Sequence, residues 1–166
     1  MIKLVSKLEP ENKQPDLLYI RPILVTSGQN ANDIVMLPQE LFAAVKTPLF
    51  KPVDWEHHGD ENDPASEIIG TIIASWFEDL DGNKLEHSNF SDMPTEFNIV
   101  TDAVVWQFLY SDRAKEIETR FKNNKLFCSM ETWFSSYDYA IKHNDNYKIV
   151  TRNKTTSSLD KYIKYK

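Results

Sequence analysis

The stretch "LFCSMETWF", residues 126–134, has a serine in the middle of a mainly apolar run. Such a run predicts a buried strand, in which Ser129 and Glu131 share one face while Cys128 points to the other. A serine hydroxyl becomes a good nucleophile only when a neighbouring base accepts its proton. A serine on a strand is more often a small hydrogen-bonded residue with no chemistry. A catalytic role for Ser129 therefore requires a base elsewhere in the chain.

His57 is the candidate base. It lies in "KPVDWEHH", residues 51–58, which predicts a strand with Val53, Trp55 and His57 on one face. A partly desolvated imidazole at the end of such a strand can accept a proton near neutral pH. The alternative interpretation is a hydrogen-bonded core histidine.

The same stretch also raises the question of a metal site, because "HHGD" is flanked by Glu56 and contains Asp60. His57 and His58 point to opposite faces of the predicted strand, however, and the sequence has no HExxH motif and no Cys/His pairs at zinc-ligand spacing. We therefore expect no metal and no other cofactor.

Composition narrows the class of protein. The chain has 166 residues, of which 41% are hydrophobic, and this suits one domain over residues 1–166. The net charge of -6 argues against general binding of nucleic acid through its phosphates. No apolar run approaches the roughly 20 residues that cross a bilayer. The single cysteine, Cys128, excludes an internal disulfide framework and predicts a buried small hydrophobe rather than a reactive thiol.

The elements that would position Ser129 and His57 are mostly strands. Period-2 patterns and turn residues predict strands and a C-terminal hairpin, and helical spacing predicts two helices. The strands are expected over residues 17–27, 51–58, 67–77, 97–109, 126–140 and 147–151, and the helices over residues 37–45 and 111–124. Strands outnumber helices and do not alternate with them. We expect an α+β fold, with a mainly antiparallel, barrel-like sheet surrounded by a few helices.

Several residues predict local features of these elements. Pro22 indicates an edge position or a bulge in its strand, and Gly70 a bulge or a close backbone approach. Ser111 is expected to cap the second helix, in which Glu116 can pair with Arg120.

Taken together, "KPVDWEHH", "IIGTI", a helix and "NNKLFCSMETWF" resemble, in that order, the prohead maturation proteases of tailed bacteriophages. That family is related in fold to the herpesvirus assemblins. Its members have a "kPvn-x-EH" strand with the catalytic histidine, a "GxI" strand, and a helix leading to an "xSmE" strand with the serine nucleophile. The resemblance covers residues 30–160. It implies a herpesvirus-protease-like fold in which His57 is the base and Ser129 the nucleophile.

The third catalytic residue is open. In the family a histidine or an acidic residue orients the base, and the candidates here are Glu131, His143, Asp102 and Asp54. Glu131 is better interpreted as a support for the strand or the substrate groove. Asp102 lies in an apolar strand and should have a partner there. His143 lies in a hairpin turn, which is usually an exposed place.

Two features depart from the family pattern. The family often has an aspartate where this chain has His58. Related chains continue past a "TssLdkyl" segment, whereas this sequence ends at "TSSLDKYIKYK". We expect the family's C-terminal segment, and with it an oxyanion-stabilising arginine, to be missing, and Arg152 to be the nearby substitute. We also expect the gene to encode residues beyond Lys166, which self-cleavage or trimming removes.

The resemblance implies a serine endopeptidase that acts inside the phage procapsid, in the host cytoplasm. Its substrates would be the scaffold protein, extensions of the major capsid protein and finally the protease itself. We expect neither nucleic acid nor membrane as a partner, and self-association into a homo-oligomer is open. The competing hypothesis is a non-catalytic capsid- or scaffold-associated protein that retains the protease fold.

Overall fold

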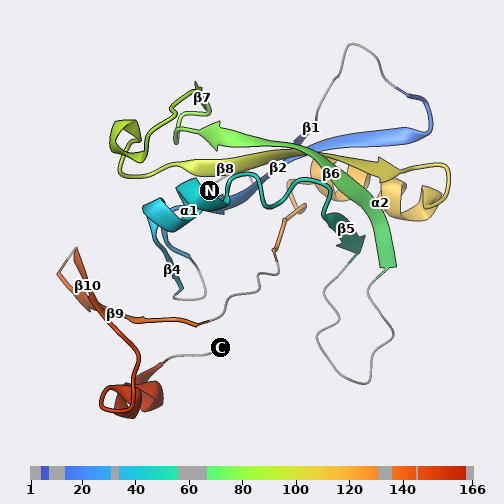
Figure 1. Cartoon of the computed structure of the whole chain (residues 1–166). Coiled ribbons are helices and arrows are strands. Elements are labelled where there is room, and N and C mark those ends of the chain that lie inside the picture. The colour runs from blue at the N-terminus through green and yellow to red at the C-terminus, as the bar shows by residue number, and fades with distance from the viewer. Residues whose placement is uncertain are drawn as a thin grey trace.

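The computed structural model describes residues 5–7, 14–30, 34–55, 67–130, 136–144 and 146–163. One six-stranded sheet carries most of the fold, in the order β1-β2-β8-β6-β5, with β7 paired to the far end of β6. All pairings are antiparallel. Figure 1 shows the long strands β2, β6 and β8 crossing the upper part of the molecule. The strands are β1 (Val5–Lys7), β2 (Leu17–Thr26), β5 (Pro52–Trp55), β6 (Glu67–Glu78), β7 (Lys84–Leu85) and β8 (Asn98–Trp106).

Smaller elements surround this sheet. Two short ribbons pair β3 with β4 and β9 with β10, and the second ribbon lies with η2 at the lower left of Figure 1. The ribbon strands are β3 (Gly28–Gln29), β4 (Val35–Met36), β9 (Tyr139–His143) and β10 (Asn146–Val150). The helices are α1 (Pro38–Ala44) and α2 (Ser111–Lys122), with 3-10 turns η1 (Phe90–Asp92) and η2 (Ser157–Tyr162).

The predicted α+β class and the antiparallel sheet are confirmed, but the predicted barrel is wrong. Strands β1 and β5 form the two edges of an open sheet. Closing a barrel requires strands of matched length, tilt and stagger. The edge strands have only three and four residues, and within the described residues 125–130 no strand follows α2 to extend the sheet.

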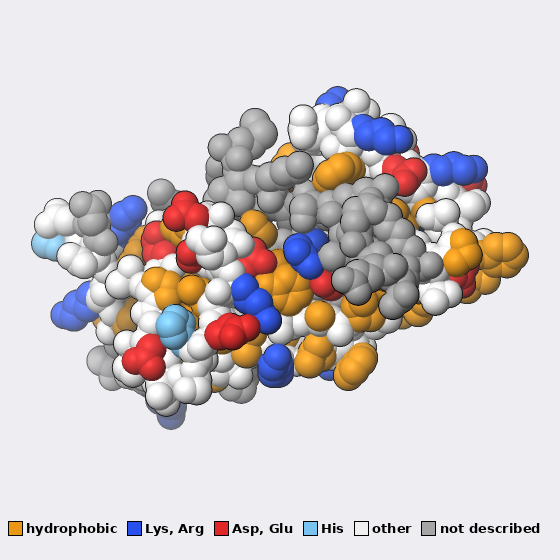
Figure 2. Space-filling model, turned by 90° about the horizontal axis from the view of Figure 1, so that it is seen from above, with side chains coloured by type: hydrophobic (Ala, Val, Ile, Leu, Met, Phe, Trp, Pro, Cys, Tyr) orange, Lys and Arg blue, Asp and Glu red, His pale blue; other side chains and the backbone are white. Residues whose placement is uncertain are grey.

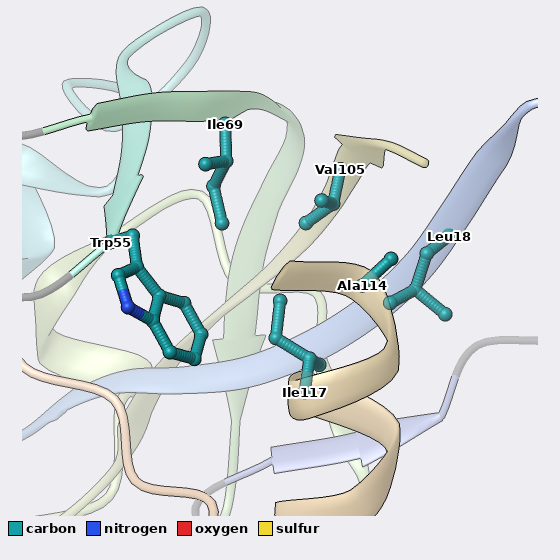
Figure 3. Packing of buried hydrophobic residues seen from close by; sticks show 6 residues of the cluster. All are labelled: Leu18, Trp55, Ile69, Val105, Ala114 and Ile117. Atoms are coloured by element: carbon teal, nitrogen blue, oxygen red, sulfur yellow. The ribbon is translucent and has the colours of Figure 1, made fainter. Parts of the chain in front are cut away.

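Two apolar clusters form the core. Ile99 and Val105 lie on the same face of β8, because they are an even number of positions apart. Ile99 belongs to the first cluster, and Val105 belongs to the second. The first cluster lies against α1, and the second lies against α2. Figure 3 shows Ala114 and Ile117 of α2 facing Trp55 and the strands. The buried members are Leu41, Phe77, Phe97 and Ile99 near α1, and Leu18, Trp55, Ile69, Val105, Ala114 and Ile117 near α2.

Helix α2 confirms one local prediction and corrects another. The Arg120 Nε lies 2.8 Å from a carboxylate oxygen of Glu116, one turn earlier, as expected. Ser111 is not the cap: it is the first helical residue, and Tyr110 is the N-cap, without a side-chain cap bond. The helix begins there because the Ala114 N–H already donates to the carbonyl of Tyr110.

The two residues expected to disturb the strands do so. The pairing of β2 with β8 shifts between Ile23 and Val25, next to Pro22, so the bulge is confirmed. The edge alternative is wrong, since β1 and β8 flank β2. Gly70 lies so close to β8 that an added Cβ would be 2.0 Å from the Val104 carbonyl oxygen. That distance is inside van der Waals contact, so only glycine fits.

We predict that Gly70→Ala lowers the free energy of unfolding by about 1–3 kcal/mol or more, because β6 must move away from β8. Gly82→Ala is the control. An added Cβ there meets nothing within 4 Å, and its φ of +89° makes the cost about 1 kcal/mol. Urea unfolding of the two variants measures the difference. Equal stability of Gly70→Ala and the unaltered chain would contradict the close approach.

Candidate functional site

The chain reverses direction at the end of α2. Asn124 has a positive φ of 54°, and its N–H donates to the Phe121 carbonyl. The next N–H, of Lys125, donates to the Arg120 carbonyl at 2.8 Å. These two bonds form a Schellman motif, which ends a helix and redirects the chain. This turn sends the segment with Ser129 back toward the sheet.

The returning segment meets the buried cluster to which Trp55 belongs. Leu126 packs against the buried cluster that contains Trp55 and Ile117. The guanidinium groups of Arg113 and Arg120, both on α2, lie 5.2 and 4.8 Å from the centre of the indole ring. One buried side chain of β5 therefore contacts α2 and belongs to the cluster that receives Leu126.

Ser129 lies in this segment, but not on a strand. Residues 125–130 have no regular secondary structure, and Ser129 is exposed. The predicted strand is wrong for residues 126–130 and 136–138, and residues 131–135 lie outside the described part of the chain. In the described part of this segment, Leu126 packs against the cluster, whereas Phe127 is 68% exposed. The run of apolar residues therefore does not form a buried strand in the described part of this segment.

The pKa of the Cys128 thiol reports on the surroundings of this segment. Burial and the charge of Asp54 raise the pKa of the Cys128 thiol to about 11. Its Sγ lies 3.5 Å from the Ser129 carbonyl oxygen. The raised pKa favours the protonated thiol at neutral pH, which agrees with the expected lack of reactivity, and the side chain is half-buried rather than buried. The charge of Asp54, on β5, therefore acts on the Ser129 segment.

Several predicted site residues fall outside the described residues. These are the base His57, its neighbour His58, and Glu131. Asp54 is described: it is partly buried on β5, three positions before His57 in the sequence. Among the candidates that the structure describes, it is the one whose charge acts on the Ser129 segment.

Asp102 has the partner that its apolar strand requires. Arg21 on β2 binds both carboxylate oxygens of Asp102, at 2.7 and 3.1 Å, and its guanidinium lies 4.9 Å from the centre of the Trp76 ring. The hydrogen bond to Asp102 raises the pKa of Arg21. Sequence reasoning expected a partner but did not identify Arg21. The available signal was two opposite charges, each inside an apolar strand.

The remaining candidates lie in the C-terminal part of the chain. His143 is the last residue of β9 and is exposed, as its turn position predicts. Arg152 pairs with Asp160 at 3.2 Å and lies 4.7 Å from the centre of the Tyr137 ring. Arg152 therefore joins the end of the β9–β10 ribbon to η2.

Asp160 is the centre of this second cluster, which sequence reasoning missed. It accepts hydrogen bonds from the hydroxyls of Tyr139, at 2.8 Å, and Tyr137, at 3.2 Å. The bonds from Arg152 and then Tyr139 lower the pKa of Asp160. The tyrosines alternate at positions 137 and 139, which was the one signal available in the sequence.

A shallow cavity of about 530 Å³ is present at another place, at the start of α2. Its lining includes no residue of β5 or of residues 125–130, so it gives no direct support to a role for Ser129. The lining residues are Pro15, Asp16, Gln107, Phe108, Ser111, Ala114, Lys115 and Glu118.

Within the described residues there is no group of three or more His, Cys, Asp or Glu side chains that could hold a metal ion. No helix in the same part of the chain is long and apolar enough to cross a membrane. Comparisons with protein families, with curated proteins and with solved structures find no match to this chain. The function must therefore be argued from its own residues.

We predict that iodoacetamide alkylates Cys128 in the folded protein on the order of 100-fold more slowly at neutral pH than a free cysteine, because its thiolate is scarce. The rate should rise with pH until about 11. Removing the neighbouring negative charge by Asp54→Asn should lower the pKa of Cys128 and speed alkylation about 2–5-fold.

The matched control is Asp112→Asn, because Asp112 is an exposed carboxylate on α2, 96% exposed. It should leave the rate unchanged. Equal rates for Asp54→Asn and the unaltered chain would show that Asp54 does not act on the Ser129 segment.

Proposed function

We propose that this chain is a serine endopeptidase of the prohead-maturation type, with Ser129 as its nucleophile and His57 as its base. The observation that supports the proposal is the packing of Leu126 on the cluster of Trp55. Ser129 follows Leu126 by three residues, and His57 follows Trp55 by two. We therefore propose that both residues act beside this one buried cluster, although they are far apart in sequence.

The chemistry would follow the usual course of acyl transfer. The Ser129 Oγ attacks the carbonyl carbon of the scissile peptide bond while the His57 imidazole takes the hydroxyl proton. The imidazolium then protonates the leaving amine, and the peptide bond breaks to give an acyl-serine ester. Water, deprotonated by the same imidazole, hydrolyses the ester and restores the serine.

Asp54 is our choice for the residue that stabilises the imidazolium. Its charge acts on Cys128, next to Ser129, whereas both oxygens of Asp102 bind Arg21. Arg152, the expected oxyanion support, is bound to Asp160. The backbone N–H groups of residues 126–130 donate to no acceptor among the described residues, and we propose them as oxyanion donors instead.

The substrate class follows from the exposed, irregular segment that carries Ser129. An extended peptide can lie along such a segment without unfolding a core. With the motif resemblance, this favours cleavage of the scaffold protein, of extensions of the major capsid protein and of the protease itself. The proposed place of action is the procapsid in the host cytoplasm.

A non-catalytic capsid- or scaffold-associated protein is the second candidate. The observation that favours it is a set of large apolar side chains that contact solvent. Such side chains mark interaction surfaces when they are grouped. The most exposed are Phe108 at 83%, Phe50 at 80%, Leu109 at 71%, Tyr162 at 70% and Phe127 at 68%.

We predict that a peptidyl phosphonate labels Ser129 stoichiometrically, because the phosphonate traps a serine that a base activates. Intact mass and peptide mapping locate the label. Ser129→Ala and His57→Ala should abolish labelling, and should also stop processing of co-expressed scaffold on a gel. Ser158→Ala, at an exposed serine in η2, is the control and should label normally.

Two outcomes decide against the enzyme. If no serine is labelled at any pH, the non-catalytic protein becomes the better conclusion. If Ser129→Ala still processes the scaffold, another residue or another protein does the cutting.

We also predict that the cleavage rate rises with pH through the titration of His57, near about 6.5, because only the neutral imidazole can accept the serine proton. Cys128 cannot contribute to this rise, since its pKa is about 11. The rate against a fluorogenic peptide, measured from about pH 5 to about pH 8, tests this. A flat profile would remove His57 from the role of base.

A further inference from the structure

The charges of the chain are unevenly distributed. Residues 136–166 carry seven Lys and Arg against three Asp, a net charge of +4. Residues 1–135 carry 12 Lys and Arg against 22 Asp and Glu, a net charge of -10, and the two parts together give the total of -6. Such asymmetry within one chain indicates a surface that binds a partner of opposite charge.

The positive part presents lysines to solvent on the β9–β10 ribbon and the turn after it. Lys142, Lys148 and Lys154, which we call the basic surface, are all exposed. Lys142 pairs with Tyr147 and Lys148 with Ile141, so the two lysines lie on opposite faces and the basic surface extends over both faces of the ribbon. Ile141 and Ile149 are 43% and 41% exposed beside them and offer apolar contact.

The negative part has a matching surface at the far end of the main sheet. Residues 78–96, around β7 and η1, carry six Asp and Glu against one lysine. Asp81, Glu86 and Asp92, which we call the acidic rim, are exposed. Figure 2 shows several acidic side chains on the left part of the face viewed from above, the side on which β7 and η1 lie in Figure 1.

The basic surface and the acidic rim are not paired with each other in the described part of the chain. None of the ion pairs between described residues joins the basic surface to the acidic rim. Glu86 pairs with Lys84 inside its own region, through side chains that are 80% and 59% exposed. Exposed pairs of this kind are weak and leave the rim open to another partner.

We propose that the basic surface of one copy binds the acidic rim of a second copy of this chain. Charge complementarity favours this occupant over nucleic acid, because a chain with a net charge of -6 repels a polyanion at long range, whereas its own acidic part attracts the lysines. The proposal does not depend on whether Ser129 is catalytic.

Sedimentation velocity of the full chain tests the contact. Self-association should be detected at about 0.02 M salt and weaken at least about 10-fold at about 0.3 M, because both surfaces are exposed to screening. The triple variant Lys142→Glu, Lys148→Glu, Lys154→Glu should be a monomer, and so should Asp81→Lys, Glu86→Lys, Asp92→Lys. Mixing the two triple variants should restore association, since one then carries only acidic and the other only basic contact surfaces.

The matched control reverses three exposed lysines elsewhere, with Lys51→Glu, Lys115→Glu and Lys122→Glu, and it should associate as the unaltered chain does. Three outcomes overturn the proposal. The first is a monomer at low salt, and the second is an equal loss of association in the control. The third is a chain that stays monomeric but binds duplex DNA through its lysines.

Discussion

The packing of the Trp55 indole is the constraint on which the rest of the site depends. Its strand, β5, is only four residues long and lies at the edge of the sheet, so strand pairing alone holds it weakly. The indole joins α2 and Leu126 in one cluster, and two arginines of α2 lie over its ring. Loss of this contact would separate the edge strand from the segment that carries Ser129.

Sequence reasoning worked where one local rule decided the outcome. The apolar stripe and the Glu116–Arg120 pair predicted α2, because helical spacing and charge pairing depend on nearby residues alone. Gly70 was also interpreted correctly, since a glycine inside a strong strand pattern usually marks a bulge or a close backbone approach. Asp102 had to be paired, because an unpaired carboxylate in an apolar strand is costly.

It failed where the outcome depended on distant partners. The residue types around Ser129 are typical of a strand. Residues 125–130 pair with no strand among the described residues, however, so they have no regular secondary structure. The predicted barrel failed for the same reason, since closure of a sheet depends on how the ends of distant strands meet in space. Neither the choice of Arg21 for Asp102 nor the cluster around Asp160 could be read from spacing, because the partners come from different elements.

The most direct measurement is the position of the His57 imidazole in a crystal structure of the chain with a phosphonate on Ser129. We predict that an imidazole nitrogen lies within hydrogen-bond distance of the Ser129 Oγ, roughly 2.6–3.2 Å, with the Asp54 carboxylate on the same side of the cluster around Trp55. An imidazole turned into the core and separated from the adduct would contradict the proposed catalytic pair.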